Sequence, residues 1–250
     1  MNHSLRMQDM QTKQQRPCLG LIVPPAHGKV PVDAEILYGQ RYEFLARGLG
    51  LQSVSTEGYE QVIDAVVDHA IALRDAGAQA VSLMGTSLSF YRGAAFTDTL
   101  RQQMEQRTGI PCTTMSHAIM RGLRSQGIRR VAVATSYIDE VNAKLRGFLQ
   151  DQGFEVLSLQ GLGIAGVEAM GQVNTATLVE LSERALRDTA SAAEGVLISC
   201  GGLVTLNAVR ELEQRHGLPV ISSSPAGFFD LVSTAGLDAS SANGGMLFRV

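Results

Sequence analysis

A cysteine followed by two glycines ends an apolar run in the second half of the sequence. Cys200-Gly201-Gly202 follows Val196 through Ser199, which predicts a buried strand, and a helix is expected to come next. The glycines let the backbone approach a ligand closely, and N–H groups near a helix start favour negative charge. A thiol with an ordinary pKa of about 8.5 can give or take a proton near neutrality. The motif is equally consistent with two roles. Cys200 either transfers a proton at an anion site or is a small structural cysteine in a core.

Polar residues or prolines follow three other expected strands. Gly85-Thr86-Ser87-Leu88-Ser89 carries hydroxyl and amide groups that can cradle an oxyanion, although Ser and Thr there are as often helix caps. Val23-Pro24-Pro25-Ala26 and Thr135-Ser136-Tyr137 are expected to converge on the same cleft. The prolines stiffen their loop, and Tyr137 offers a phenol, although an isolated tyrosine of this kind is more often core or rim than functional.

The chain repeats itself imperfectly. Val81 through Phe90 aligns with Val196 through Thr205, each an apolar strand that ends in small residues and leads to a helix. In this alignment Gly85 is the counterpart of Cys200. Such repeats predict two similar α/β halves, and ligands of open α/β sheets bind outside the carboxyl ends of the strands. The repeat therefore predicts a cleft between the halves, with a thiol on one side only.

Short apolar runs alternate with segments of helical period, which is typical of an α/β fold with a mainly parallel sheet. The expected strands span 18–23, 79–84, 110–114, 130–135, 155–159, 195–199 and 218–222. The expected helices span about 57–76, 98–107, 117–126, 139–151, 175–190, 206–215 and 226–235. Thr56 is placed to cap the first of these helices, and Asn174 or Thr175 to cap the fifth.

One glycine pattern matches the dinucleotide-binding fingerprint by spacing alone. Gly161-x-Gly163-x-x-Gly166 would need an immediate helix and an acidic residue that ends the next strand about 20 residues further on. Glu180 and Glu183 fall inside an expected helix instead. The pattern therefore predicts a loop, and NAD is not expected.

Lysine and histidine usage argues for chemistry without a cofactor. The chain has three lysines, and of these only Lys29 is expected near the cleft. Schiff-base and pyridoxal enzymes need a buried, desolvated lysine. The five histidines show no ligand spacing, so no metal site is expected.

Composition narrows the class of protein. Of the 250 residues 45% are hydrophobic and 18% are charged, which is typical of a globular protein, and a net charge of −3 makes nucleic acid and anionic membranes poor partners. Residues 1–16 are polar, lack the apolar segment of a secretory signal and are expected to form a disordered tail. No run approaches the roughly 18 apolar residues of a membrane span, and the three cysteines show no disulfide framework. A cytoplasmic protein with reduced thiols is expected.

These features resemble the arylmalonate decarboxylase family, within the aspartate/glutamate racemase superfamily, over about residues 18–236. The segments that carry the resemblance are Leu21–Pro25, Val81–Gly93, Ala134–Tyr137, Gly166–Met170, Ser199–Leu203 and Ser222–Gly227. Racemases and maleate isomerases of the superfamily carry a cysteine in each half, whereas here Gly85 stands where the first would be. The resemblance implies two four-stranded, mainly parallel sheets flanked by helices and related by a pseudo-twofold axis. The expected halves are 17–122 with 225–250, and 123–224, with the active site between them.

The resemblance also implies an activity, the cofactor-independent and enantioselective decarboxylation of α-aryl or α-alkenyl malonates through an enediolate. It implies that Cys200 protonates the enediolate to give a 2-substituted monocarboxylic acid. Thr86, Ser87 and Tyr137, with backbone amides near Ser87 and Gly201, would hold the retained carboxylate.

The remaining implied roles concern the shape of the pocket. An apolar wall around the departing carboxylate is implied for Pro24, Leu51, Val54, Val167 and Met170. Tyr59 and Gly85 would border the space for the larger group of the substrate. The expected partner is a small dicarboxylate; the oligomeric state is open, and a monomer is plausible.

Two other functions stay open at this point. A racemase or isomerase of the same superfamily, similar to maleate isomerase, would need a second base besides the lone cysteine of the cleft. A bilobed binding protein for small carboxylates would need no thiol at all.

Overall fold

The computed structural model describes residues 16–249, and these form two four-stranded sheets. The first sheet has the order β2-β1-β3-β4, and the second has the order β6-β5-β7-β8. The strands of the first are β1 (Cys18–Val23), β2 (Glu43–Gly48), β3 (Val81–Leu83) and β4 (Cys112–Thr114). Those of the second are β5 (Arg130–Thr135), β6 (Glu155–Gly161), β7 (Gly195–Ser199) and β8 (Val220–Ser222). All pairings within both sheets are parallel, so the expected fold class is confirmed.

One strand, β2 (Glu43–Gly48), is absent from the strands that the sequence predicts. It lies at the edge of the first sheet, pairs only with β1 and is half exposed along its length. An edge strand is covered on fewer sides than a central one, so its sequence, EFLARG, lacks the continuous apolar run by which buried parallel strands are found. The other seven strands lie where the sequence places them, with each end within two residues of the expected one.

The helices of the first sheet differ in detail from those expected. The segment expected as one helix over 57–76 consists of α2 (Thr56–Val62), a 3-10 turn (Ile63–Ala65) and α3 (Val66–Asp75). Its cap is Ser55, whose hydroxyl accepts the Gly58 amide at 3.2 Å, and not Thr56 as predicted. Three short helices are additional to those that the sequence predicts: α1 (Asp33–Tyr38), α4 (Thr86–Phe90) and α8 (Val167–Met170).

The longer helices follow the helical period of the sequence. They are α5 (Ala94–Thr108), α6 (Met115–Ser125), α7 (Asp139–Asp151), α9 (Thr175–Arg187), α10 (Leu206–His216) and α11 (Ser223–Thr234). Asn174 caps α9 by accepting the Thr177 amide at 2.9 Å, which confirms one of the two predicted caps. None of the helices in the described part of the chain is long and apolar enough to cross a membrane.

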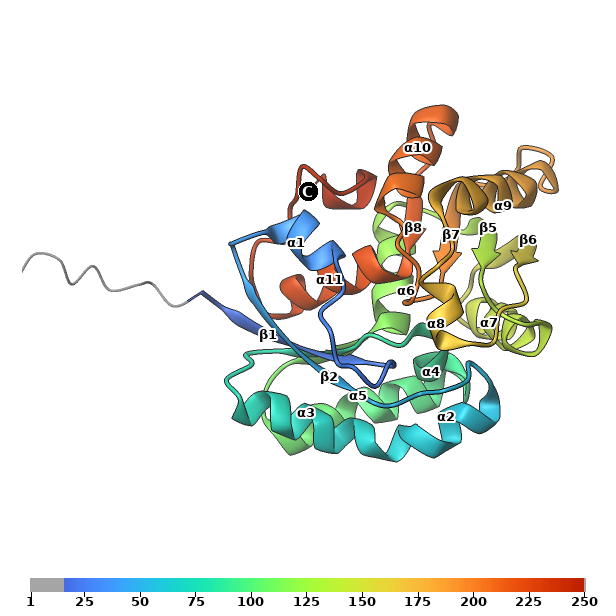
Figure 1. The fold of residues 1–250 in the computed structure, drawn as a ribbon. Coiled ribbons are helices and arrows are strands. Elements are labelled where there is room, and N and C mark those ends of the chain that lie inside the picture. The colour runs from blue at the N-terminus through green and yellow to red at the C-terminus, as the bar shows by residue number, and fades with distance from the viewer. Residues whose placement is uncertain (1–15, 250) are drawn as a thin grey trace, which may run out of the picture.

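Helices α6 and α11 join the two halves of the molecule. Figure 1 shows α2, α3 and α5 along one side of β1 and β2, with α11 on the other side. Helices α6 and α11 pack against each other, and both contact β4 of the first sheet and β8 of the second. One continuous hydrophobic core includes strands of both sheets. The expected tail over 1–16 lies outside the described residues except for Arg16, and the predicted boundaries of the two halves stay a prediction.

Candidate active site

A cavity of about 530 Å³ lies between the two halves, where the ends of β1, β3 and β7 approach α8. Ten of the twelve site residues expected from the sequence line it: Pro24, Leu51, Val54, Gly85, Thr86, Ser87, Val167, Met170, Cys200 and Gly201. This is the place that open parallel sheets offer to ligands, outside the carboxyl ends of the strands.

Cys200 directly follows β7 and has a side chain that is only 4% exposed. Its thiol donates toward the Met170 thioether across 3.3 Å, and the Gly202 amide donates to its sulfur at 3.4 Å. Its own amide donates to the Ser223 hydroxyl at 3.1 Å, which fixes the turn after the strand. Burial raises the pKa of the Cys200 thiol above its usual value, because the charged thiolate is poorly solvated there. The thiol is therefore held in its neutral form at neutral pH.

Gly85 lines the same cavity at the equivalent position of the first sheet. It lies two residues after β3 and directly before α4. A Cβ atom built on it would lie 3.1 Å from Pro24 Cγ and 3.2 Å from Leu88 Cβ, a tight fit. The absence of a side chain therefore leaves the cavity without a reactive group at this position.

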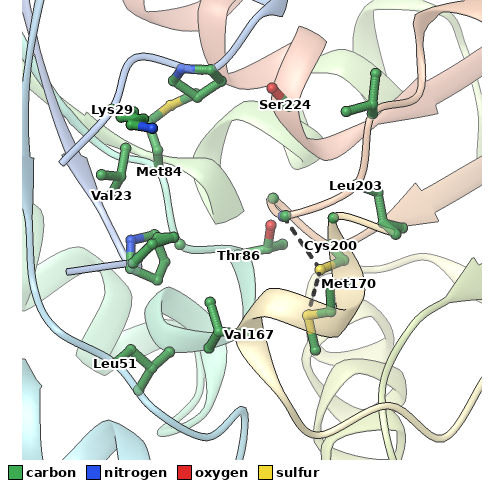
Figure 2. Close-up of a pocket in the computed structure, with 18 of the residues that line it drawn as sticks. Val23, Lys29, Leu51, Met84, Thr86, Val167, Met170, Cys200, Leu203 and Ser224 are labelled. Carbon is green, nitrogen blue, oxygen red and sulfur yellow. Dashed lines mark hydrogen bonds between the residues drawn. The ribbon is translucent and has the colours of Figure 1, made fainter. Parts of the chain in front are cut away.

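Thr86 and Ser87 begin the short helix α4 and are both buried. The Thr86 hydroxyl donates to the Met115 thioether at 2.7 Å, and Figure 2 shows Thr86 between Val167 and Cys200 in the middle of the view. The amides of residues in a first helical turn have no partner within their own helix. The structure thus brings the hydroxyl and amide groups of a first helical turn to the cavity wall.

Tyr59 and Tyr137 do not line the cavity, and both lie buried behind its wall. The Ser199 hydroxyl donates to the Tyr137 oxygen at 3.4 Å. The pKa of Tyr137 is raised well above its usual value, mainly by burial and to a smaller extent by the nearby Cys200 thiol. Burial likewise raises the pKa of Tyr59, whose hydroxyl lies near Ser87 without a hydrogen bond of normal geometry. Both phenols are therefore neutral, and their predicted roles with substrate stay predictions.

The apolar wall of the cavity comes from both halves of the chain. Pro24, Leu51 and Val54 belong to the first half, and Val167 and Met170 belong to α8 in the second. An isolated antiparallel bridge between Ser53 and Gly166 joins the loop that carries Leu51 and Val54 to the residue directly before α8.

The wall opposite Cys200 is not among the features that the sequence predicts. Lys29, Asp33, Met84 and Ser224 line the cavity as well, and Figure 2 shows Lys29 on the opposite side of the view from Cys200. Lys29 is the one lysine expected near the cleft from the sequence. Met84 and Ser224 lie in segments that carry the family resemblance but have no predicted role, and Asp33 lies in no such segment. Within residues 16–249 no three His, Cys, Asp or Glu side chains gather as a metal site would need.

Comparison with known proteins agrees with the geometry. The family model for arylmalonate decarboxylase matches residues 19–248. The arylmalonate decarboxylase of Bordetella bronchiseptica is 55% identical over 93% of this chain and 96% of its own length. The maleate isomerase of Alcaligenes faecalis is 22% identical over 91% of this chain and 94% of its own length.

Solved structures show the same fold. A crystal structure of arylmalonate decarboxylase superimposes with a TM-score of 0.84 at 54% identity, covering 93% of this chain and 99% of that one. A maleate isomerase from Pseudomonas putida S16 gives a TM-score of 0.85 at 20% identity, covering 94% of this chain and 98% of that one, and this shows likeness of fold alone. On the family match and the 55% identity, the chain belongs to the arylmalonate decarboxylase family.

Proposed function

We propose that the protein decarboxylates α-aryl or α-alkenyl malonates to single enantiomers of 2-substituted monocarboxylic acids, without a cofactor. The observation that carries the proposal is the pairing of a buried, neutral Cys200 thiol with a bare Gly85 in one cavity. The family of the chain supports the reaction class, because the curated relative at 55% identity is an arylmalonate decarboxylase.

The bond that breaks joins the α-carbon to the departing carboxylate. Its electron pair passes to the α-carbon and on to the retained carboxylate, which becomes a planar enediolate. We assign the donation of hydrogen bonds to these two oxygens to the hydroxyls of Thr86 and Ser87 and the backbone amides of Ser87 and Gly201, because these residues line the cavity; the Thr86 hydroxyl would exchange its contact with Met115 for the substrate. Each preorganised donor of this kind is worth about 3–4 kcal/mol in the transition state. The Tyr137 phenol, buried beside Ser199, stays a predicted donor to the same carboxylate.

The departing carboxylate faces the apolar wall of Leu51, Val54, Val167 and Met170. A carboxylate that is pressed against hydrocarbon loses hydration that no hydrogen bond replaces, which costs several kcal/mol. Conversion to neutral CO2 relieves this cost, so the apolar wall selects which of the two carboxylates leaves.

Protonation completes the reaction and sets its stereochemistry. The Cys200 S–H bond breaks, its proton goes to the α-carbon, and the thiolate that remains takes a proton from water. Because Gly85 offers no acid on the opposite side, the proton arrives from one face only. The same asymmetry disfavours the isomerase alternative, since proton exchange on both faces needs a second acid or base.

A small substrate panel tests the proposal. The protein is incubated with phenylmalonate and with α-methyl-α-phenylmalonate, and both CO2 release and the chirality of 2-phenylpropanoate are measured. We expect CO2 from both and one enantiomer in large excess from the second. Absence of CO2 release from the whole panel would refute the proposal, and a racemic product would refute its stereochemical part.

A further inference from the structure

The cavity extends well beyond the groups that the proposed reaction uses. Figure 2 shows Lys29 on the opposite side of the view from Cys200 and Met170, with Ser224 above the space between them. The segment from Lys29 to Asp33, together with Met84, forms this far end. A cavity of about 150 Å³ already holds a benzene ring, so 530 Å³ leaves room beyond the malonate head and an aryl ring.

The far end carries an exposed cation. In the described part of the chain, no ion pair or hydrogen bond engages the Lys29 ammonium group. The Lys29 amide donates to His27 Nδ1 at 3.1 Å, which ties down the backbone from which the side chain projects. Glu168, the other acidic residue of the cavity wall besides Asp33, belongs to α8 on the side of Met170.

Two buried polar groups of the cavity wall have no hydrogen-bond partner in the described part of the chain. Asp33 is 2% exposed and Ser224 is 1% exposed, and neither Asp33 Oδ1 nor Ser224 Oγ makes a hydrogen bond within the described chain. Burial raises the pKa of the Asp33 carboxyl, with the nearby Ser224 hydroxyl opposing the shift in part. A neutral carboxyl can donate a hydrogen bond. Buried polar groups without partners are uncommon, and a ligand that supplies the partner removes their cost.

We infer that this far end is a subsite for an anionic group on the α-substituent of the substrate, a distal carboxylate that pairs with Lys29. Asp33 and Ser224 would border the space beside this group. The inference rests on the proposed function and narrows its substrate class to malonates whose aryl or alkenyl group carries a further acid. Lys29 is then a residue that determines specificity and takes no part in the bond-breaking step.

Pairs of substrates that differ only in distal charge test the subsite, through the ratio of their kcat/KM values. Phenylmalonates with a carboxylate at the meta or para position of the ring are compared with their carbamoyl counterparts, which have nearly the same shape and no distal charge. The ratio divides kcat/KM for the carboxylate by kcat/KM for its counterpart. For the better-fitting isomer we expect a ratio of roughly 10 in the wild type, the size of one charge-assisted hydrogen bond. The Lys29→Met variant should lower this ratio to about 1, and raised salt should lower it in the wild type.

A control variant removes the same charge elsewhere. Lys144 lies on α7, outside the cavity wall, so Lys144→Met should leave the ratio as in the wild type. Equal ratios in the wild type and Lys29→Met, or a loss of preference in Lys144→Met, would overturn the subsite.

Binding without turnover separates this inference from the proposed function. Calorimetry compares carboxyphenylacetate with carbamoylphenylacetate on the wild type and on Lys29→Met. Tighter binding of the charged compound by the wild type only, about tenfold, supports the subsite even if no malonate releases CO2. Turnover of phenylmalonate with no charge preference in either assay would refute the subsite and leave the proposed function standing.

Discussion

Gly85 and Cys200 hold the same position in two sheets of the same strand order. In the first sheet Ile22 pairs with Leu83, and the Met84 amide donates to the Ile22 carbonyl at 2.8 Å. In the second, Thr135, the last residue of β5, pairs with Ser199. By the same register Val23, the last residue of β1, is level with Met84, so Gly85 follows this level just as Cys200 follows the level of Thr135 and Ser199, and both line the cavity. The asymmetry of the site is thus a difference of one side chain between two equivalent positions.

A second thiol at Gly85 should give the cavity two acids. Because a Cβ there lies 3.1 Å from Pro24 Cγ and 3.2 Å from Leu88 Cβ, the Gly85→Cys variant fits after a shift of a few tenths of an ångström. We expect it to racemise 2-arylpropanoates, measured as loss of optical rotation and as deuterium uptake at the α-carbon in D2O. Gly85→Ala has the same added Cβ without the thiol and should not racemise. A Gly85→Cys variant that keeps its product optically pure would contradict the facing arrangement.

A hydroxyl in the apolar wall should slow the loss of CO2. Threonine at position 54 has nearly the same shape as valine but offers a hydrogen-bond donor to the departing carboxylate. The bound carboxylate is then better solvated, so less desolvation cost is relieved when CO2 forms. We expect kcat for phenylmalonate to fall about tenfold, with KM unchanged or lower. Val62→Thr on α2, outside the cavity wall, serves as the control. An unchanged kcat in Val54→Thr would show that the apolar wall does not promote the loss of CO2.

The carboxyl of Asp33 should make stability depend on pH. Burial raises its pKa in the folded protein above the unfolded value of about 3.9. Stability that the neutral acid provides is fully present below the unfolded pKa and is lost as pH rises through the folded pKa. Asp33→Asn keeps the shape and cannot ionise, so it should be more stable than the wild type at pH 8 by about 1–3 kcal/mol. The difference should shrink toward pH 4.

Urea unfolding at several pH values between 4 and 8 measures this difference. Asp151→Asn changes an exposed carboxylate at the end of α7 and should show no such trend. A wild type that is more stable than Asp33→Asn at pH 8 would show that the Asp33 carboxylate is satisfied in the folded protein.

The repeat in the sequence predicts the part of the site that comes directly from strand ends. Cys200 and Gly85 align because each follows a buried strand, and a central strand of a parallel sheet is read from its apolar run. The edge strand Glu43–Gly48 escapes this pattern because half of its surface faces solvent. Alignment of equivalent strands thus locates the two positions on which the proposed chemistry depends.

The far wall of the cavity could not be predicted in the same way. Asp33 and Ser224 are 191 positions apart and meet only because α1 packs against α11. Tyr59 and Tyr137 are buried and are not among the residues that line the cavity, since strand position alone does not tell whether a large side chain reaches the cavity or fills the core beside it; their roles with substrate stay predictions.

Turnover by the Cys200→Ala variant tests whether Cys200 is the proton donor. Phenylmalonate decarboxylation is compared in the wild type, Cys200→Ala, Cys200→Ser and Cys112→Ala, the last being a buried cysteine outside the cavity wall. Since a general acid contributes about 10²–10⁴ to the rate, both Cys200 variants should lose at least a hundredfold in kcat while keeping the wild-type circular dichroism, and Cys112→Ala should keep its activity. A folded Cys200→Ala protein with near-normal turnover would show that the proton comes from another group.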